Sequence, residues 1–401
     1  MRSIKTKLFS LAMAVSMVLA LAGCAMSTPS TVGSIGGVDI PAGIYLLAQY
    51  NSYNTASGLA KLATGETASD VKAVLKATCT GTINGEEVTA PGSEYVAQLT
   101  TRAIEYYAAV EKQFAEQNGV LDDAATAEAA NVEKQFAAQN GVLDDAATAE
   151  AANTADSLWG TNGDLYTANG ISKATVETYL LNAQKAKALL KMTYGPEGTT
   201  PVTEAEYTDY VNNDCYYIEA VQFPLVNYSS YTMADDTQKA SIMATAESCM
   251  EELSRTATAE TASGSALYTA AMTYVPQAMA AMGSEMDASQ AIYYAASQLY
   301  TPDDLSSYGS DEYNNLTDPL DAAGLNHWTT IDLGTTILVA RRIDPFKTYT
   351  VDELDSMYDL LTDMKSTAIQ DELYAAGAAL EHDLNSAALN TYSASKIEKN
   401  A

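Results

Sequence analysis

Residues 203–223, TEAEYTDYVNNDCYYIEAVQF, mark the point where the chain changes from helical to mixed structure. The first ten of them predict a short helix, and the alternation in residues 216–223 predicts a strand. A second, buried strand is expected at residues 337–340, ILVA. Between the two strands, residues 235–255 predict a helix, and a helical stretch rich in Ala, Met and Tyr is expected to continue to about Tyr300. The middle of the chain is therefore expected to be α+β.

Helical periodicity dominates on both sides of this region. Apolar residues recur at three- and four-residue steps over residues 93–114, which predicts a long amphipathic helix with Arg102 outside its apolar face. Another helix is expected over residues 41–56, a further one begins after the N-cap Ser172, and helix returns over residues 350–397. The expected fold class is α+β, mostly α-helical.

A tandem duplication occupies residues 110–153. The 22 residues 110–131, VEKQFAEQNGVLDDAATAEAAN, recur as residues 132–153 with a single difference, Glu116 against Ala138. Each copy holds an Asn-Gly pair that can end a helix and an Asp-Asp pair that can begin the next one. We expect the copied segment to protrude from the fold and not to enlarge its core.

Composition limits the chemistry of the chain. Lys and Arg number 21 against 51 Asp and Glu, and the net charge of −30 repels phosphate backbones, so no nucleic-acid partner is expected. The two His, His327 and His382, lie far apart and show no ligand spacing, so no metal site is expected. No serine-hydrolase elbow, P-loop or dinucleotide motif is present, so no catalytic residue and no cofactor are assigned. A non-enzymatic function is favoured.

The N-terminus predicts export and a lipid anchor. Three basic side chains lie within the first seven residues, and the apolar stretch 8–22 is too short to span a membrane comfortably. Residues 21–24, LAGC, resemble the bacterial lipobox, in which the Cys thiol receives diacylglycerol. Cys24 is accordingly the predicted lipid attachment site. The protein is expected on the outer face of the bacterial cytoplasmic membrane.

Three cysteines remain once Cys24 carries lipid, namely Cys79, Cys215 and Cys249. An odd number of thiols cannot all pair within one chain, and their spacings match no Cys-x-x-Cys pattern. One disulfide remains open, but buried, unreactive thiols are the favoured interpretation.

Tyrosine is unusually frequent, with 26 Tyr against five Phe. Tyr combines an apolar ring with a polar tip, so a surface rich in Tyr can touch unfolded chains loosely. A wet core in an Ala-rich helical protein is the other interpretation, and it is slightly favoured.

Four segments together resemble a known family. They are the lipobox, residues 32–45 (VGSIGGVDIPAGIY), residues 170–176 (GISKATV) and residues 202–207 (VTEAEY). In these segments and in their order, the chain resembles the foldase lipoproteins of the PrsA type and the periplasmic chaperone SurA. The resemblance implies a helical chaperone module, formed by N- and C-terminal helices, with a small parvulin prolyl isomerase domain inserted between them.

The resemblance also implies a division of the chain. Residues 1–23 are expected to be a lipoprotein signal peptide and residues 24–34 a lipid-anchored tether. Residues 35–198 are expected to form the N-terminal part of the chaperone module, including the duplication, and residues 346–401 to complete it. A degenerate parvulin-like domain is expected over residues 199–345.

The inserted domain departs from its family where the chemistry lies. Parvulins resemble this region in layout and place one His in the first strand and one in the closing strand. Aligned by eye, Gln222 and Thr336 stand in those two places, and Thr335 stands where an aromatic residue is usual. A hydroxyl or an amide can hold a hydrogen bond but cannot titrate near neutral pH. The isomerase chemistry is therefore expected to be lost.

The function expected from these observations is that of a lipid-anchored extracytoplasmic chaperone, a foldase or holdase, whose partners are unfolded or partly folded secreted polypeptides. One alternative is an active peptidyl-prolyl cis-trans isomerase of the parvulin type, with its site rebuilt around Thr, Gln and Tyr. A second alternative is a surface solute-binding or adhesion lipoprotein. A typical solute-binding protein would show alternating βαβ patterns in two lobes, which this sequence lacks.

Overall fold

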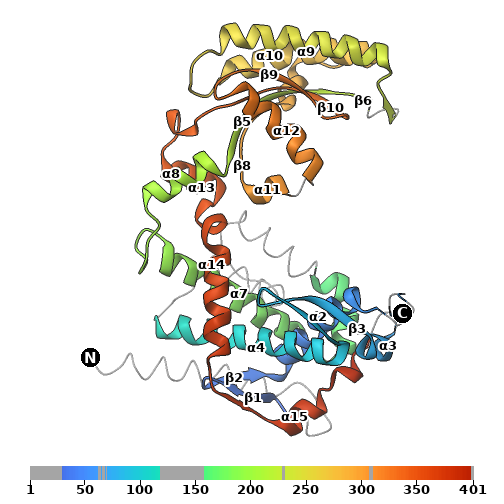
Figure 1. Cartoon of the computed structure of the whole chain (residues 1–401), viewed down its shortest axis with the longest axis vertical. Coiled ribbons are helices and arrows are strands. Elements are labelled where there is room, and N and C mark those ends of the chain that lie inside the picture. Colours follow the sequence, from blue (N-terminus) through green and yellow to red (C-terminus); the bar gives the residue numbers. More distant parts are fainter. Residues whose placement is uncertain are drawn as a thin grey trace, which may run out of the picture. The chain divides into compact units, whose positions relative to one another are not determined.

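The computed structural model describes residues 29–61, 65, 68, 70–117, 158–227, 231–306 and 310–398. The signal peptide and Cys24, and most of the duplicated segment, lie outside these residues. The chain divides into two compact units, drawn in Figure 1. Unit 1 takes the described residues up to Thr193 and from Thr367 onward, and unit 2 comprises Tyr194–Ser366. Among the described helices, none is both long enough and apolar enough to cross a membrane.

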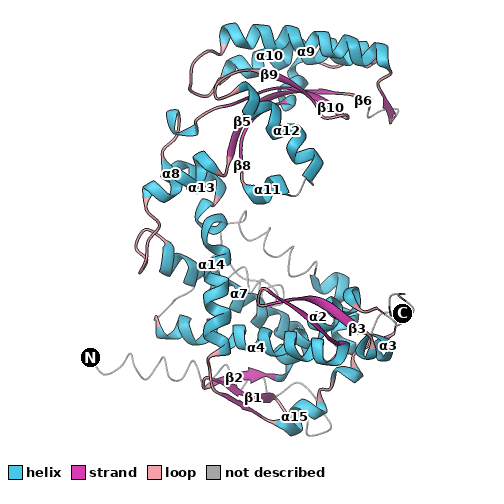
Figure 2. Cartoon of the chain, viewed as in Figure 1, coloured by secondary structure: helices cyan, strands magenta, loops and turns pink. Residues whose placement is uncertain are grey.

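Unit 1 consists of helices with two small antiparallel sheets (Figure 2). Its helical elements are α2 (Ala42–Leu59), α3 (Val71–Lys76), α4 (Gly92–Glu116), nearly all of α7 (Lys173–Tyr194), the later part of α14 (Leu360–Ala378), α15 (Ser386–Thr391) and the 3-10 helix η3 (Ala394–Lys396). Its strands are β1 (Thr31–Ile35), β2 (Val38–Pro41), β3 (Thr78–Ile83), β4 (Glu86–Pro91) and β11 (His382–Leu384). The helices expected over residues 41–56 and 93–114 are confirmed as α2 and α4. The helix expected after Ser172 is confirmed as α7.

The two ends of the described chain meet in the three-stranded sheet of unit 1, whose strand order is β11-β1-β2. Strand β1 pairs with β11 from Gly33 opposite Leu384 to Ile35 opposite His382. A Cβ atom on Gly33 would lie 2.3 Å from the Asp383 carbonyl oxygen, so this close approach requires glycine. N- and C-terminal segments are thereby held together by backbone hydrogen bonds.

This sheet corrects the expectation of continuous helix over residues 350–397. Helix α13 (Val351–Tyr358) ends at Asp359, which has a φ of 51°, in the left-handed region that stops a helix. Helix α14 then ends at Ala378, and β11 follows. The C-terminal region is therefore divided into separate elements, and one of them, β11, satisfies the free edge of β1.

Unit 2 is an antiparallel four-stranded sheet with helices on both faces. The strand order is β8-β5-β10-β9, with β5 (Tyr216–Pro224), β8 (Ala295–Tyr300), β9 (Thr329–Asp332) and β10 (Thr336–Arg342). Its helical elements are α8 (Glu204–Asn213), α9 (Asp236–Thr256), α10 (Ser265–Ala281), η1 (Ala288–Tyr294), α11 (Pro302–Ser306), α12 (Ser310–Ala323), η2 (Pro345–Lys347) and α13. A two-stranded ribbon joins β6 (Val226–Asn227) and β7 (Thr232–Met233). The mostly helical α+β class and the strands expected at residues 216–223 and 337–340 are confirmed.

The expectation of helix as far as Tyr300 is wrong at its end. Helix α10 gives way after Met282 to Gly283, which has a φ of 73°. Residues 295–300 form β8, which pairs with β5 from Tyr216 opposite Tyr300 onward. Strand β5 has two hydrogen-bonding edges, and β8 satisfies the one that β10 leaves open.

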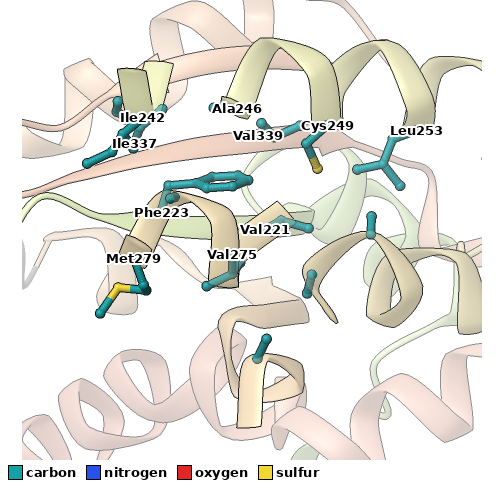
Figure 3. Packing of buried hydrophobic residues seen from close by; sticks show 14 of the residues in the cluster. Val221, Phe223, Ile242, Ala246, Cys249, Leu253, Val275, Met279, Ile337 and Val339 are labelled. Atoms are coloured by element: carbon teal, nitrogen blue, oxygen red, sulfur yellow. The ribbon is translucent and has the colours of Figure 1, made fainter. Parts of the chain in front are cut away.

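The two faces of the sheet carry two separate cores. Figure 3 shows the face on which Phe223 and Val339 pack against Ile242 and Cys249 of α9 and Val275 of α10. The opposite face is covered by α11 and α12. Its core combines buried residues of three strands and two helices: Tyr216, Ile218, Ala220, Leu305, Leu320, Ile331, Leu338 and Ala340. Alternation along β5 and β10 thus assigns each residue to one face of the sheet.

A buried ion pair joins the two central strands to the loop between α9 and α10. Arg341 and Glu219 are register partners and fully buried, and Arg341 Nε donates to Glu219 Oε2 at 2.9 Å. The guanidinium also donates to Asn326, to the Ser263 hydroxyl and to three loop carbonyls, those of Ala257, Ala259 and Thr261. Both oxygens of Glu219 accept from Ser263, one from its N–H and one from its hydroxyl, each at 2.6 Å. This network holds the loop against the sheet.

The thiols of Cys79, Cys215 and Cys249 are buried and unpaired, which confirms the favoured interpretation. Burial raises the pKa of Cys215 and of Cys249 to about 12. These thiols are therefore protonated and unreactive in the folded protein.

Candidate functional site

Gln222 and Thr336 lie on one face of the two central strands of unit 2. Gln222 is opposite Leu338, and Thr336 is opposite Pro224, so the two residues are diagonal neighbours about 7–8 Å apart. Gln222 is exposed and Thr336 is half-buried. The Thr336 hydroxyl donates to the Phe223 carbonyl at 3.1 Å and is thereby used within the sheet. The structure brings the two residues together, but neither side chain can exchange a proton near neutral pH.

A cavity of about 210 Å³ lies in unit 1 among α2, α4, α7 and α14, and we call it the tyrosine cavity. Its larger apolar and aromatic lining residues are Ile44, Leu99, Tyr106, Tyr107, Tyr179 and Tyr374. Its polar lining residues are Asn51, Ser52, Thr55, Arg102 and Asn182. Neither Gln222 nor Thr336 lines it.

Helical spacing on α4 supplies one wall of the tyrosine cavity. Leu99, Arg102, Ala103 and Tyr106 follow one another at steps of three, one and three residues, and all four face the cavity. Residues separated by three or four positions share a helix face, so this pattern forms a continuous stripe. The periodicity that predicted the helix therefore also positions the cavity wall.

Most of the polar lining groups are already hydrogen-bonded within the protein. The hydroxyls of Ser52 and Thr55 donate to carbonyls one turn earlier on α2, at 2.7 Å and 3.2 Å. The amide of Asn182 donates to the Tyr107 carbonyl at 3.2 Å and to Glu111 at 3.0 Å. These groups shape the cavity, and the tyrosine rings and Arg102 form much of the rest of its lining.

Two tyrosines of the cavity, Tyr106 and Tyr107, are neutral at physiological pH. Burial, together with the nearby hydroxyls of Tyr374 and Tyr179, raises the pKa of Tyr106 to about 12. Burial, followed by the charge of Glu111, also raises the pKa of Tyr107. The rings of Tyr106 and Tyr374 lie 4.7 Å apart between centroids. The cavity thus offers aromatic surface with hydroxyl tips.

Arg102 lies on the cavity wall, which corrects its expected place outside the apolar face of the helix. Its guanidinium carbon lies 3.7 Å from the centroid of the Tyr374 ring. Its Nε is buried and has no acceptor among the described residues. The sequence signal for this position is its spacing, three residues after Leu99 and four before Tyr106.

The two histidines lie in different units. His327 is exposed, and its Nδ1 lies 2.8 Å from the Leu325 carbonyl oxygen. His382 Nε2 lies 3.1 Å from Glu105 Oε1. Burial raises the pKa of Glu105, and His382 opposes that shift. Within the described parts of the chain, no three His, Cys, Asp or Glu side chains are grouped so that they could hold a metal ion.

Tyrosine occurs both in the core and at the tyrosine cavity. Tyr53 and Tyr95 are almost fully buried in the core of unit 1, whereas Tyr179 is 47% exposed at the cavity. The chain therefore uses Tyr as core material and as cavity lining.

Comparisons with known proteins give a distant structural similarity. A scan against protein-family models finds no match, and no curated protein matches the sequence. Among solved structures, the foldase protein PrsA from Streptococcus pneumoniae is similar over 78% of this chain and 98% of its own, with 12% sequence identity and a TM-score of 0.30.

Proposed function

We propose that this protein is an extracytoplasmic chaperone, a foldase or holdase, that binds unfolded or partly folded secreted polypeptides. The tyrosine cavity is the observation that carries the proposal. Aromatic rings bind apolar side chains over a large area, and their hydroxyl tips can bond to the peptide backbone. Three of the cavity's side chains, Tyr106, Tyr179 and Tyr374, come from three different helices and present such a surface.

The proposal assigns a role to each part of the chain. Residues 35–198 and 346–401 would form the chaperone module, and residues 199–345 would be a parvulin-like insert. The pairing of β1 with β11 supports the first assignment, because it joins N- and C-terminal segments. The second is supported by the layout of the insert, in which a first strand, helices and a closing strand follow one another.

Membrane anchoring and the lack of isomerase activity complete the proposal. Cys24 would carry the lipid and hold the protein at the outer face of the bacterial cytoplasmic membrane. Gln222 and Thr336, in place of a histidine pair, would leave the insert without isomerase chemistry. The hydrogen bond from Thr336 to the Phe223 carbonyl supports the lack of isomerase chemistry, because the hydroxyl already donates its proton to the sheet backbone.

An aggregation assay with matched tyrosine variants tests the proposal. The chain from residue 25 to residue 401 is added to a chemically denatured, aggregation-prone test protein, and light scattering is followed. Suppression is expected near stoichiometric amounts. Tyr179→Ala should weaken the suppression about two- to twelvefold, because an aromatic contact contributes about 0.5–1.5 kcal/mol.

Tyr293→Ala is the matched control, because Tyr293 is 83% exposed in unit 2 and lines no part of the tyrosine cavity. It should suppress aggregation as well as the wild type does. Absence of suppression by the wild-type chain at any ratio would overturn the proposal. If the two variants lose suppression of aggregation equally, the tyrosine cavity is not the binding surface.

A further inference from the structure

We propose that the tyrosine cavity selects polypeptide segments in which an Asp or Glu side chain adjoins an apolar residue, with Arg102 as the group that binds the carboxylate. The inference rests on the proposed function and adds to it the chemistry of the segment that is recognised.

Among the described residues, Arg102 has no acidic partner, although the chain has a large excess of acids. Acidic residues outnumber basic ones by 51 to 21. Other cations pair readily: Lys185 lies 2.5 Å from Glu111, and Lys239 lies 2.6 Å from Asp332. Within the described residues, Arg102 makes no hydrogen bond and no ion pair, and its contact is with the ring of Tyr374.

The carboxylates nearest to Arg102 on α4 are engaged elsewhere. Glu105, one turn later, approaches His382 at 3.1 Å. Glu94, two turns earlier, accepts from Gln98 at 3.4 Å. A buried guanidinium N–H without an acceptor is unfavourable, so an incoming oxygen would remove that penalty.

The geometry of Arg102 suits a carboxylate. Stacking on Tyr374, with 3.7 Å from the guanidinium carbon to the ring centroid, limits the orientations of the side chain. The forked N–H groups of a guanidinium match the two oxygens of a carboxylate, and such pairs are shorter and stronger than neutral hydrogen bonds. Little ordering is left to do when the ligand arrives.

The surroundings of Arg102 determine what must accompany the carboxylate. Leu99 and Ala103 lie beside it on α4, and Tyr106 lies one turn further on. A volume of about 210 Å³ accommodates one or two side chains of an extended segment. An acidic side chain entering alone would leave the aromatic surface uncovered, so the favoured segment carries an apolar neighbour.

The net charge of the protein makes this local cation matter. At −30 the chain repels acidic segments at long range, and physiological salt screens that repulsion beyond about 8 Å. The Arg102 guanidinium, which has no acidic partner in the described part of the chain, therefore decides whether an acidic residue is accepted in the tyrosine cavity.

Two matched peptides test the inference. Both are fluorescein-labelled Gly/Ser peptides of about ten residues; one carries a central Leu-Glu-Phe, and the other carries Leu-Gln-Phe. Fluorescence anisotropy measures their binding to the chain from residue 25 to residue 401, which retains every described residue, at about 0.15 M salt. The Glu peptide should bind about tenfold more tightly, as expected for one charge-assisted pair.

Variants then assign the preference to one side chain. Arg102→Gln should bind both peptides equally, and Arg102→Lys should keep only part of the preference because ammonium lacks the fork. Lys112→Gln is the matched control: it removes one charge from the same helix, where Lys112 lies 3.4 Å from Glu116. It should keep the full preference. Thermal unfolding verifies that each variant is folded. If Arg102→Gln does not fold, Arg102→Lys still tests the role of the side chain.

The outcomes separate this inference from the function on which it rests. Equal binding of the two peptides by the wild type would overturn the preference and leave the chaperone proposal intact. An equal loss of the preference in Arg102→Lys and Lys112→Gln would likewise overturn the role of Arg102 and leave the chaperone proposal intact. Failure of the wild type to bind either peptide would overturn both.

Discussion

Replacing Arg341 by Met is expected to lower the free energy of unfolding of unit 2 by about 3–5 kcal/mol, the usual cost of removing one partner from a buried ion pair. Glu219 would stay fully buried, with only the N–H and hydroxyl of Ser263 as donors. The loop carbonyls that now accept hydrogen bonds from Arg341 would also lose their donors. Loop and sheet would therefore be destabilised together.

Urea unfolding followed by tryptophan fluorescence measures this loss. The chain has two tryptophans, and in a Trp159→Phe background the remaining one, Trp328, reports on unit 2. Its ring centroid lies 4.9 Å from the guanidinium carbon of Arg341, so the signal arises beside the substitution.

Two further variants make the prediction specific. Arg255→Met removes an exposed arginine paired with Glu252, and it should cost less than about 1 kcal/mol. The double variant Glu219→Leu with Arg341→Met should recover part of the loss, because no uncompensated charge remains buried. A loss for Arg341→Met no larger than that for Arg255→Met would refute the reasoning.

Three further predictions concern pH, thiols and glycine. Burial raises the pKa of Asp363 and of Glu105, so the native state takes up protons at a higher pH than the unfolded chain does. The midpoint of urea unfolding should therefore rise as the pH falls from 7 toward about 5. A steady decline of the midpoint would contradict this. The three buried thiols should react with a disulfide reagent at least about a hundredfold more slowly in the native protein than in urea, and comparable rates would show that they are accessible. Gly33→Ala should lower the melting temperature far more than Gly37→Ala does, because only at Gly33 would the new Cβ meet backbone; equal shifts would argue against the β1–β11 pairing.

Much of the fold follows from short-range patterns in the sequence. Strands β5 and β10 show their apolar character locally, and both were expected. Helix α8 begins after Thr203, which forms a capping box with Glu206. Helix α9 begins in the same way after Asp235. Where side chains near in sequence determine the structure, prediction succeeds.

Other elements depend on partners far away in the chain. Residues 295–300, AASQLY, become a strand because β5 presents a free edge, and no local pattern separates them from the preceding helix. Strand β11 has three residues and pairs with β1, about 350 positions earlier. The hairpin β1–β2 likewise forms the middle and one edge of the sheet that β11 completes. Tertiary pairing overrides local preference in these segments.

The candidate site was only partly accessible from the sequence. Register pairing brings Gln222 and Thr336 together, as their places in two strands suggest. The tyrosine cavity needs residues from four helices, and its members are separated by up to about 330 positions. Arg102 looks like an ordinary surface residue until the position of Tyr374 is known.

Refolding of a proline-limited test protein, run beside an aggregation assay, tests the central claim most directly. Prolyl isomerisation otherwise takes tens of seconds or more, so catalytic amounts of an isomerase are readily detected. A chaperone without isomerase activity should suppress aggregation near stoichiometric amounts and leave the refolding rate unchanged. Acceleration at catalytic amounts would instead establish a prolyl isomerase and contradict the interpretation of Gln222 and Thr336, and no effect in either assay would contradict the chaperone function itself.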